Sequence, residues 1–357
     1  MLADARCLLS RVGSRRQPAR WGLGRSRHVR LLGAGLLISA AAGLGGAGWA
    51  QEPSVPARSV TDWLSRMHEA SRYRAYVGTL VVTAGPAMSA AKIWHVCDGK
   101  QQMERVDTLT GAPRTTIRRN NEVITFEPDA RQAIVETRES LGLFPDLLRT
   151  PQNVIAQHYG AKALGVQRVA GHLADMVEIQ PKDELRFGYR VWSEQKTGLV
   201  VKLQTLGEGG RVIEQVAFSE LQLDAPVSME KLTRLMKDTR GYEVVKPTLR
   251  KTTAQAQGWR LKEPVPGFES MSCHTRAVDG AEVPGQAPMQ WVFSDGLASV
   301  SLFVEPFDPS RHGEEGGTAF GATHSVSRRV GDHWVTAVGE VPAATLQRFA
   351  LSLERTP

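Results

Sequence analysis

Short runs of residues with a two-residue period dominate the chain from Tyr76 onwards, and this pattern constrains the fold most strongly. The runs end in pairs such as Asp98-Gly99 and Asn120-Asn121, which favour tight turns. Because successive strand side chains point to opposite faces, closely spaced runs of this kind predict an antiparallel meander. The first expected strands are Tyr76–Thr83, Lys92–Cys97, Gln102–Leu109, Thr115–Arg119, Glu122–Glu127 and Arg131–Glu136.

Two helical segments interrupt the meander, which then resumes. Helices are expected over Leu141–Leu148 and Pro151–Tyr159, and further strands over Ala161–Val169, Asp175–Gln180, Phe187–Trp192, Leu199–Leu206 and Val212–Phe218. In the run Arg186–Trp192, alternation places Tyr189 on one face and Trp192 on the other. Since both faces carry large rings, the sheet is expected to pack on other elements or to enclose a cavity.

The chain on either side of this meander favours helices and a second unit. Ser59-Val60-Thr61-Asp62 resembles a capping box in which a short acid replaces the usual Glu, and the helix it opens is expected to end near Tyr73. Residues 227–254 are interpreted as an interdomain linker that contains a short helix. Residues 255–357 are expected to form a smaller α+β domain whose final helix has Pro342 in its first turn. Its expected strands are Arg276–Val278, Met289–Phe293, Ala298–Val304, Ala322–Arg329 and His333–Glu340.

The first fifty residues have the composition of a secretory signal peptide. They hold eight arginines and one acid, Asp4, and twenty residues without a charge follow Arg30. Small residues at the −3 and −1 positions predict cleavage between Ala50 and Gln51. The alternative is a membrane anchor, because the uncharged stretch is just long enough to span a bilayer. In both cases residues 51–357 would be exported, so the predicted location is the periplasm.

The basic charge of the chain is confined to this leader. The chain has 44 Lys and Arg and 37 Asp and Glu residues, and 36 of each kind lie beyond Ala50. Nucleic-acid-binding domains carry their basic excess in the folded part, so no nucleic-acid partner is expected. Of the cysteines, Cys97 and Cys273 lie beyond the leader. An oxidising compartment permits a disulfide between them, but the sequence does not establish the Cα separation of roughly 6 Å that a bridge needs, and two separate thiols are favoured.

No sequence motif predicts catalysis, a metal or a cofactor. Ser89-Ala90-Ala91-Lys92 and Lys196-Thr197-Gly198 match short elements of penicillin-recognising enzymes. In those enzymes the serine opens a helix, whereas Lys92 here continues into an expected strand. The histidines and cysteines lack the close spacing of structural zinc sites, and no P-loop occurs. We therefore expect a binding protein and not an enzyme.

Several blocks, in order along the chain, carry a resemblance to a known family. They are Tyr73–Leu80, Ile117–Val123, Leu143-Phe144-Pro145, Arg186–Trp192 with Thr197-Gly198-Leu199, Gly258-Trp259, Pro266-Gly267-Phe268, Ser294–Leu297 and Val338–Pro342. Taken together they resemble the RseB/MucB family of periplasmic regulators of the sigma-E (AlgU-type) factor. The resemblance covers essentially all of the chain beyond the leader, while the arginine-rich leader and the two cysteines depart from the family pattern.

The resemblance implies both a fold and a function. The fold is a LolA/LolB-like N-terminal domain over 51–226, a curved antiparallel sheet (half-barrel) wrapped around helices, together with the smaller C-terminal domain. The function is to bind the periplasmic part of a transmembrane anti-sigma factor of the RseA/MucA type and to shield it from proteolysis, with release by lipid or lipopolysaccharide fragments. The alternative is a periplasmic lipoprotein or lipid carrier of the LolA/LolB type. The sequence leaves the oligomeric state open, a homo-oligomer included.

Two groups of residues are candidate binding sites. An apolar pocket would bury an acyl chain at roughly 0.8 kcal/mol per CH₂, although an ordinary core is the more frequent role of such residues. Its candidate lining is Phe187, Tyr189, Val191, Trp192, Leu199, Val201, Leu203 and Phe218. The candidates for partner binding, for which solvated surface charge is the alternative, are Arg186, Arg190, Lys246, Arg250 and Lys251.

Overall fold

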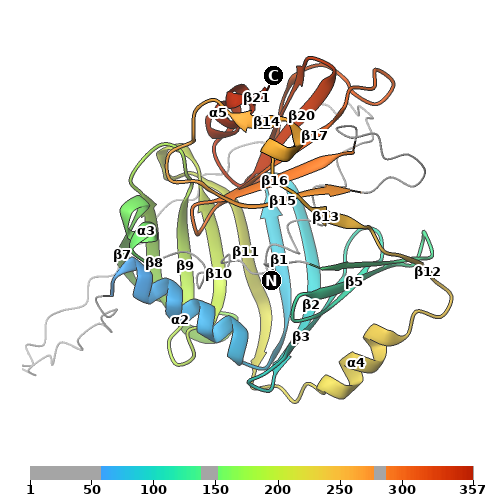
Figure 1. Ribbon diagram of the computed structural model, residues 1–357. Coiled ribbons are helices and arrows are strands. Elements are labelled where there is room, and N and C mark those ends of the chain that lie inside the picture. Colours follow the sequence, from blue (N-terminus) through green and yellow to red (C-terminus); the bar gives the residue numbers. More distant parts are fainter. Residues whose placement is uncertain (1–57, 138–151, 277–286, 357) are drawn as a thin grey trace, which may run out of the picture.

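The computed structural model describes residues 58–137, 152–276 and 287–356, which form two large sheets (Figure 1). The larger sheet has twelve strands in the order β12-β6-β5-β4-β3-β2-β1-β11-β10-β9-β8-β7. All neighbouring strands are antiparallel except β12 and β6, which run parallel. The sheet is open and curved, and the smaller sheet lies across one end of it.

The larger sheet is built from two meanders that meet in its middle. The first contains β1 (Tyr76–Ala84), β2 (Ala87–Cys97), β3 (Gln102–Thr108), β4 (Thr115–Arg119), β5 (Glu122–Glu127) and β6 (Gln132–Thr137). Helix α3 (Gln152–His158) precedes the second, which contains β7 (Tyr159–Val169), β8 (His172–Pro181), β9 (Gly188–Glu194), β10 (Val200–Leu206) and β11 (Val212–Leu223). Because β11 pairs with β1, the two meanders form one continuous surface.

Helix α2 (Val60–Tyr73) lies along the inner face of this curved sheet. The predicted capping box is present, since the Ser59 hydroxyl accepts the Asp62 N–H at 3.1 Å and the Asp62 carboxylate accepts the Ser59 N–H at 3.2 Å. One stripe of the helix is buried, at Val60, Trp63, Leu64, Met67 and Ala70. This stripe packs with the inward side chains of β1, β2 and β7 to β11 in the main core of the larger sheet.

Helix α4 (Met229–Lys237) covers part of the outer face. Its Thr233 hydroxyl donates to the Met103 sulfur at 3.2 Å, and two apolar residues of α4 are buried beside Met103 in a separate core. Glu104 is the next residue on β3. In the cross-strand register it lies opposite His95, which lies opposite Tyr76, and Tyr76 belongs to the core that contains α2. Since neighbouring residues of a strand point to opposite faces, α4 and α2 lie on opposite sides of the sheet.

The smaller sheet has seven antiparallel strands in the order β13-β15-β16-β17-β20-β19-β18. These are β13 (Leu249–Lys251), β15 (Glu269–Arg276), β16 (Met289–Ser294), β17 (Ser299–Pro306), β18 (Gly316–Phe320), β19 (Thr323–Val330) and β20 (His333–Gly339). Helix α5 (Ala343–Ser352) packs on one face, where Leu346 and Phe349 are fully buried. A ribbon of β14 (Trp259–Leu261) and β21 (Leu353–Arg355) completes this unit.

Residues 227–254 contain the predicted short helix, α4, and are joined to both sheets. Strand β12 (Glu243–Val245) adds to the edge of the larger sheet beside β6, and β13 forms an edge of the smaller sheet beside β15. The segment therefore differs from a free linker, because its backbone finds hydrogen-bond partners at both sheet edges, where unpaired groups would otherwise remain.

The α+β class and the curved antiparallel sheet are confirmed. Of the strand predicted over Arg276–Val278, Arg276 ends a strand that begins at Glu269, whose polar residues hide the strand pattern, and residues 277–278 lie outside the described residues. The predicted helix Leu141–Leu148, the leader and the cleavage site between Ala50 and Gln51 lie outside the described residues. Within the described ranges, no helix has the length and apolar character needed to cross a membrane.

Replacing Leu64 with alanine tests whether α2 is held by its buried stripe. Leu64 is fully buried in the main core, so Leu64→Ala is expected to lower the free energy of unfolding by about 2–5 kcal/mol, through lost burial and a cavity. Glu69 lies on the exposed side of the same helix, and Glu69→Ala is the matched control. Urea unfolding followed by circular dichroism measures both, and equal small effects would contradict this packing.

Candidate functional site

The eight residues predicted to line an acyl pocket lie together in the main core of the larger sheet. None is more than 6% exposed, and all belong to the apolar cluster that contains the α2 stripe, although Trp192 lies on the opposite face of the sheet from Tyr189. Phe218, for example, meets the Tyr76 ring edge-on at 6.0 Å. The structure thus shows these residues in core contacts, and their role in binding an acyl chain stays a prediction.

Trp192 is buried on the face opposite Tyr189, as alternation predicts. Its cross-strand partner is Lys202, whose ammonium lies 4.3 Å from the centre of the indole ring. The indole N–H donates to Oε1 of Gln167 at 2.8 Å. Polar side chains therefore cover the outer ring, so this face buries a large ring beneath long polar side chains.

Arg186, a predicted partner-binding residue, has a side chain that is fully buried within the chain, so here it makes internal contacts and is not presented to a partner. Its Nε donates to Asp295 at 2.5 Å, and Nη2 donates to the carbonyl oxygen of Pro266 at 3.0 Å. Asp183 accepts from Nη1 at 2.5 Å. Arg186 thus joins the larger sheet to the smaller one, a role that strand alternation alone does not reveal.

The other predicted cations are accessible. Arg190 is about one-third exposed and forms an ion pair with Glu178 on the neighbouring strand at 2.8 Å. Lys246, Arg250 and Lys251 are exposed on the segment that passes from β12 to β13. Positive charge is therefore presented beside the junction of the two sheets, and its use in partner binding stays a prediction.

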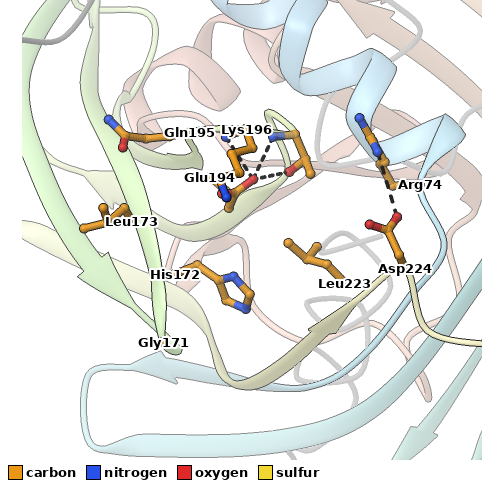
Figure 2. Close-up of a pocket in the computed structure, with 10 residues that line it drawn as sticks. Arg74, Gly171, His172, Leu173, Glu194, Gln195, Lys196, Leu223 and Asp224 are labelled. Atoms are coloured by element: carbon orange, nitrogen blue, oxygen red, sulfur yellow. Dashed lines mark hydrogen bonds and ion pairs between the residues drawn. The ribbon is translucent and has the colours of Figure 1, made fainter.

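An open hollow of about 470 Å³ lies at the end of the larger sheet where several turns meet (Figure 2). It is lined by Arg74, Gly171, His172, Leu173, Glu194, Gln195, Lys196, Thr197, Leu223 and Asp224. Arg74 and Asp224 form an ion pair at 3.8 Å on one side of it. None of the predicted lining residues borders this hollow, so the sequence did not identify it; its residues come from four separate turns and share no local motif.

The Lys196-Thr197-Gly198 element is a tight turn between β9 and β10. The Glu194 carboxylate accepts the N–H groups of Lys196 and Thr197 and the Thr197 hydroxyl. Gly198 has φ of +86°, and a Cβ there would lie 2.9 Å from the Arg66 side chain. Arg66 in turn donates to the Gln195 carbonyl oxygen at 2.5 Å. This element therefore anchors α2 to the sheet, and Ser89–Lys92 lies in strand β2 and does not open a helix.

A buried row of polar side chains on the inner face was also missed by sequence analysis. His95, Glu104 and Arg118 are cross-strand neighbours on β2, β3 and β4, and Arg118 pairs with Glu104 at 3.6 Å. Burial is the largest single influence on Glu104 and favours its neutral form, but the nearby positive charges, Arg118 first among them, together lower the carboxyl pKa. Burial also lowers the pKa of His95. The row is an internal charge pair beside a neutral imidazole, which two-residue alternation could have placed on one face.

The described side chains indicate neither a metal site nor a reactive nucleophile. Within the ranges that the structure covers, no group of three His, Cys, Asp or Glu side chains could hold a metal ion. Cys97 and Cys273 are both free thiols, the first half-buried and the second buried. Burial raises the pKa of the Cys273 thiol to about 11, so at neutral pH it is almost entirely in the unreactive thiol form.

Comparison with known proteins identifies two matching family models. The model described as the MucB/RseB N-terminal domain matches residues 59–236, and the model of the MucB/RseB C-terminal domain matches residues 253–354. Their two matched stretches correspond to the two sheets, with the first ending inside α4.

Several curated proteins resemble the chain over most of its length. The Pseudomonas aeruginosa protein named sigma factor AlgU regulatory protein MucB is 29% identical over 84% of this chain and 92% of its own. The Haemophilus influenzae sigma-E factor regulatory protein RseB is 26% identical over 80% of this chain and 88% of its own. The protein of the same name from Escherichia coli K12 is 23% identical over 82% and 89% of the two chains.

Solved structures agree with these relatives. MucB in complex with MucA(peri) superposes with a TM-score of 0.63 at 27% identity, covering 83% of this chain and 99% of that one. MucB alone superposes with a TM-score of 0.58 at 25% identity, covering 83% and 97%. The similarity therefore extends through both sheets.

The two thiols are expected to differ in reactivity. At pH 7.5 in the native protein, Cys97 should react with N-ethylmaleimide at least about tenfold faster than Cys273, because the thiolate is the nucleophile and burial suppresses it at Cys273. Peptide mass spectrometry over a time course measures both rates. In urea the difference should disappear, and equal rates in the native protein would contradict the burial of Cys273.

Proposed function

The chain belongs to the MucB/RseB family, and from this premise we propose that it binds the periplasmic part of a transmembrane anti-sigma factor. The observation that carries the proposal is the match of both family models, in order, to residues 59–236 and 253–354. The structure of MucB with MucA(peri) shows that a relative of the same two-sheet architecture binds such a partner. Bound in this way, the chain would shield the anti-sigma factor from proteolysis and keep the envelope-stress sigma factor inactive.

We place this activity in the periplasm and propose that it involves no catalysis. The leader, with eight arginines before an uncharged stretch and small residues before Gln51, supports export. Charged side chains such as Glu194 and Asp62 are used in a turn and in a helix cap. These features support a protein that acts by binding. Its proposed parts are a signal peptide (1–50), a sheet domain (51–226), a connecting segment (227–254) and a smaller domain (255–357).

The exposed connecting segment is the proposed contact for an acidic part of the partner. Lys246, Arg250 and Lys251 lie within six residues of one another and are all exposed. Arg190 remains a weaker candidate because its side chain is only about one-third exposed. Charges at the rim of an interface mainly raise the association rate and the salt dependence of binding, so this segment is expected to guide association.

Charge reversal of this segment tests the proposal. The partner is the purified periplasmic domain of the anti-sigma factor encoded in the same genome, and surface plasmon resonance measures the affinity and the association rate. The triple variant Lys246→Glu, Arg250→Glu and Lys251→Glu is expected to bind at least about tenfold more weakly, with the loss concentrated in the association rate. The matched control reverses Lys162, Arg168 and Arg348, which are exposed on β7 and α5.

The outcomes separate the function from the interface. No binding by the unchanged chain would overturn the proposed function itself. Binding that the Lys246, Arg250 and Lys251 reversals leave unchanged, or that the control reversals weaken equally, would overturn only the placement of the contact.

Release by lipid is the second part of the proposal, and it separates a regulator from a lipid carrier. Purified lipopolysaccharide is expected to lower the affinity for the anti-sigma domain, because an acyl chain entering the core around Val191 and Leu203 would have to displace α2. A carrier would instead move acylated cargo to acceptor vesicles and would not bind the anti-sigma domain. Competition calorimetry and a vesicle transfer assay on the same preparation measure the two, and transfer without anti-sigma binding would favour the carrier.

A further inference from the structure

The contact between the two sheets contains several buried polar groups. Each sheet with its helices, called here the larger and the smaller lobe, has its own apolar core. Each core takes one leucine from the opposite lobe, since Leu297 joins the core of the larger lobe and Leu185 that of the smaller. Domain contacts that rely on polar groups separate more easily than large apolar ones, so this contact has the character of a reversible joint.

One side of the joint is the ion pair of Arg186 and Asp295. Both side chains have no exposed surface. The Tyr159 hydroxyl donates to the same carboxylate oxygen of Asp295 at 2.9 Å, while the other oxygen accepts the N–H groups of Leu297 and Ala298. Both carboxylate oxygens of Asp295 thus have hydrogen-bond partners. The ion pair holds the lobes together only while Arg186 and Asp295 both stay in place.

The other side of the joint is formed by Glu214 and the turn between β18 and β19. The Glu214 carboxylate is buried and accepts the Ala322 N–H at 3.2 Å. Gly321 has φ of +59°, and a Cβ there would lie 2.6 Å from Glu214 and 2.8 Å from Ala84. The turn therefore fits tightly against the end of the larger sheet, and a small separation would break the contact.

A histidine lies beside the first of these contacts. Gly267 borders both side chains: a Cβ atom on it would lie 2.5 Å from Nε2 of His158 and closer still to Nη2 of Arg186. The imidazole therefore lies next to the guanidinium. Burial is the largest cause that lowers the pKa of His158, and the charge of Arg186 and that of Lys182 lower it further. The carboxylates of Asp295 and Asp183 oppose this shift and do not cancel it.

A second histidine crosses the joint from the smaller lobe. His324 on β19 meets the ring of Phe187 from the larger lobe edge-on, with 5.4 Å between ring centres. Its Nδ1 is buried and has no hydrogen-bond partner among the described residues. Burial lowers the pKa of His324, and no charged group contributes to that shift. A protonated ring here would be buried against an aromatic ring without a counter-ion.

We propose that the two lobes are joined by an acid-sensitive contact, in which protonation of His158 and His324 makes the lobes separate as folded bodies. Each imidazole binds its proton more weakly in the closed form than in the open form, where its pKa returns towards the ordinary 6.5. By linkage, closure is fully favoured above pH about 6.5 and weakens as the pH falls below it. The proposal does not depend on the identity of any partner.

Small-angle X-ray scattering on the full exported chain tests this directly. The radius of gyration is expected to rise between pH 7.5 and pH 5.0, while far-ultraviolet circular dichroism stays unchanged. The logarithm of the open-to-closed ratio should change with pH with a slope approaching about two, one for each histidine. His158→Gln or His324→Gln alone should reduce the slope to about one, and the double variant should show no transition.

Three further variants give the matched comparison. Arg186→Gln removes the ion pair and is expected to open the lobes already at pH 7.5. Arg190→Gln removes a similar charge four residues away, from a pair within the larger lobe, and should leave closure unchanged. His274→Gln removes a histidine that pairs with Lys251 at the sheet edge, and should leave the slope at about two.

Three results would overturn the inference. The first is a radius of gyration that is the same at both pH values in the unchanged chain. The second is a transition that persists in the double histidine variant. The third is a loss of circular dichroism in step with the scattering change, because the lobes would then unfold instead of separating. The pH titration of the unchanged chain decides the matter even where a variant fails to fold.

Discussion

The buried ion pair of Arg186 and Asp295 determines how the two sheets are arranged. Each charge alone would be costly inside the protein, and removing one partner of such a pair typically costs about 3–5 kcal/mol because the other is left uncompensated. Here every polar group of the pair is satisfied: Arg186 by Asp295, Asp183 and the Pro266 carbonyl, and Asp295 by Tyr159 and two backbone N–H groups. The pair therefore specifies one orientation of the lobes without adding a common apolar core.

This division explains why a binding function suits the molecule. Each lobe has its own core and its own helix, α2 or α5, and β12 and β13 join the segment between them to both sheets. Surfaces from two separately folded lobes meet at a polar joint, with exposed cations on the connecting segment. A partner in contact with both lobes would sense their relative position, and this is a property that a single rigid sheet does not have.

The sequence predicted the local elements well and the long-range contacts poorly. The capping box at Ser59 and the turn pairs between strands are local signals, and α2 and β4 have the expected bounds as a result. The short edge strands β12 and β13 were missed, because only pairing with β6 and β15 makes them strands. Arg186 was assigned to the surface, since alternation gives the face of a residue but not what covers that face; its partner Asp295 is 109 residues away.

The same distinction applies to the candidate acyl pocket. Alternation correctly grouped large apolar residues such as Tyr189 and Leu203, but packing then filled the space between them with α2. The helix is fastened at one point by Arg66, which bonds Ser193 and Gln195 at the turn before Gly198. An acyl chain that entered this core would have to move the helix and break those bonds. Lipid entry would therefore be linked to the position of α2, and the predicted acyl pocket would open only with movement of that helix.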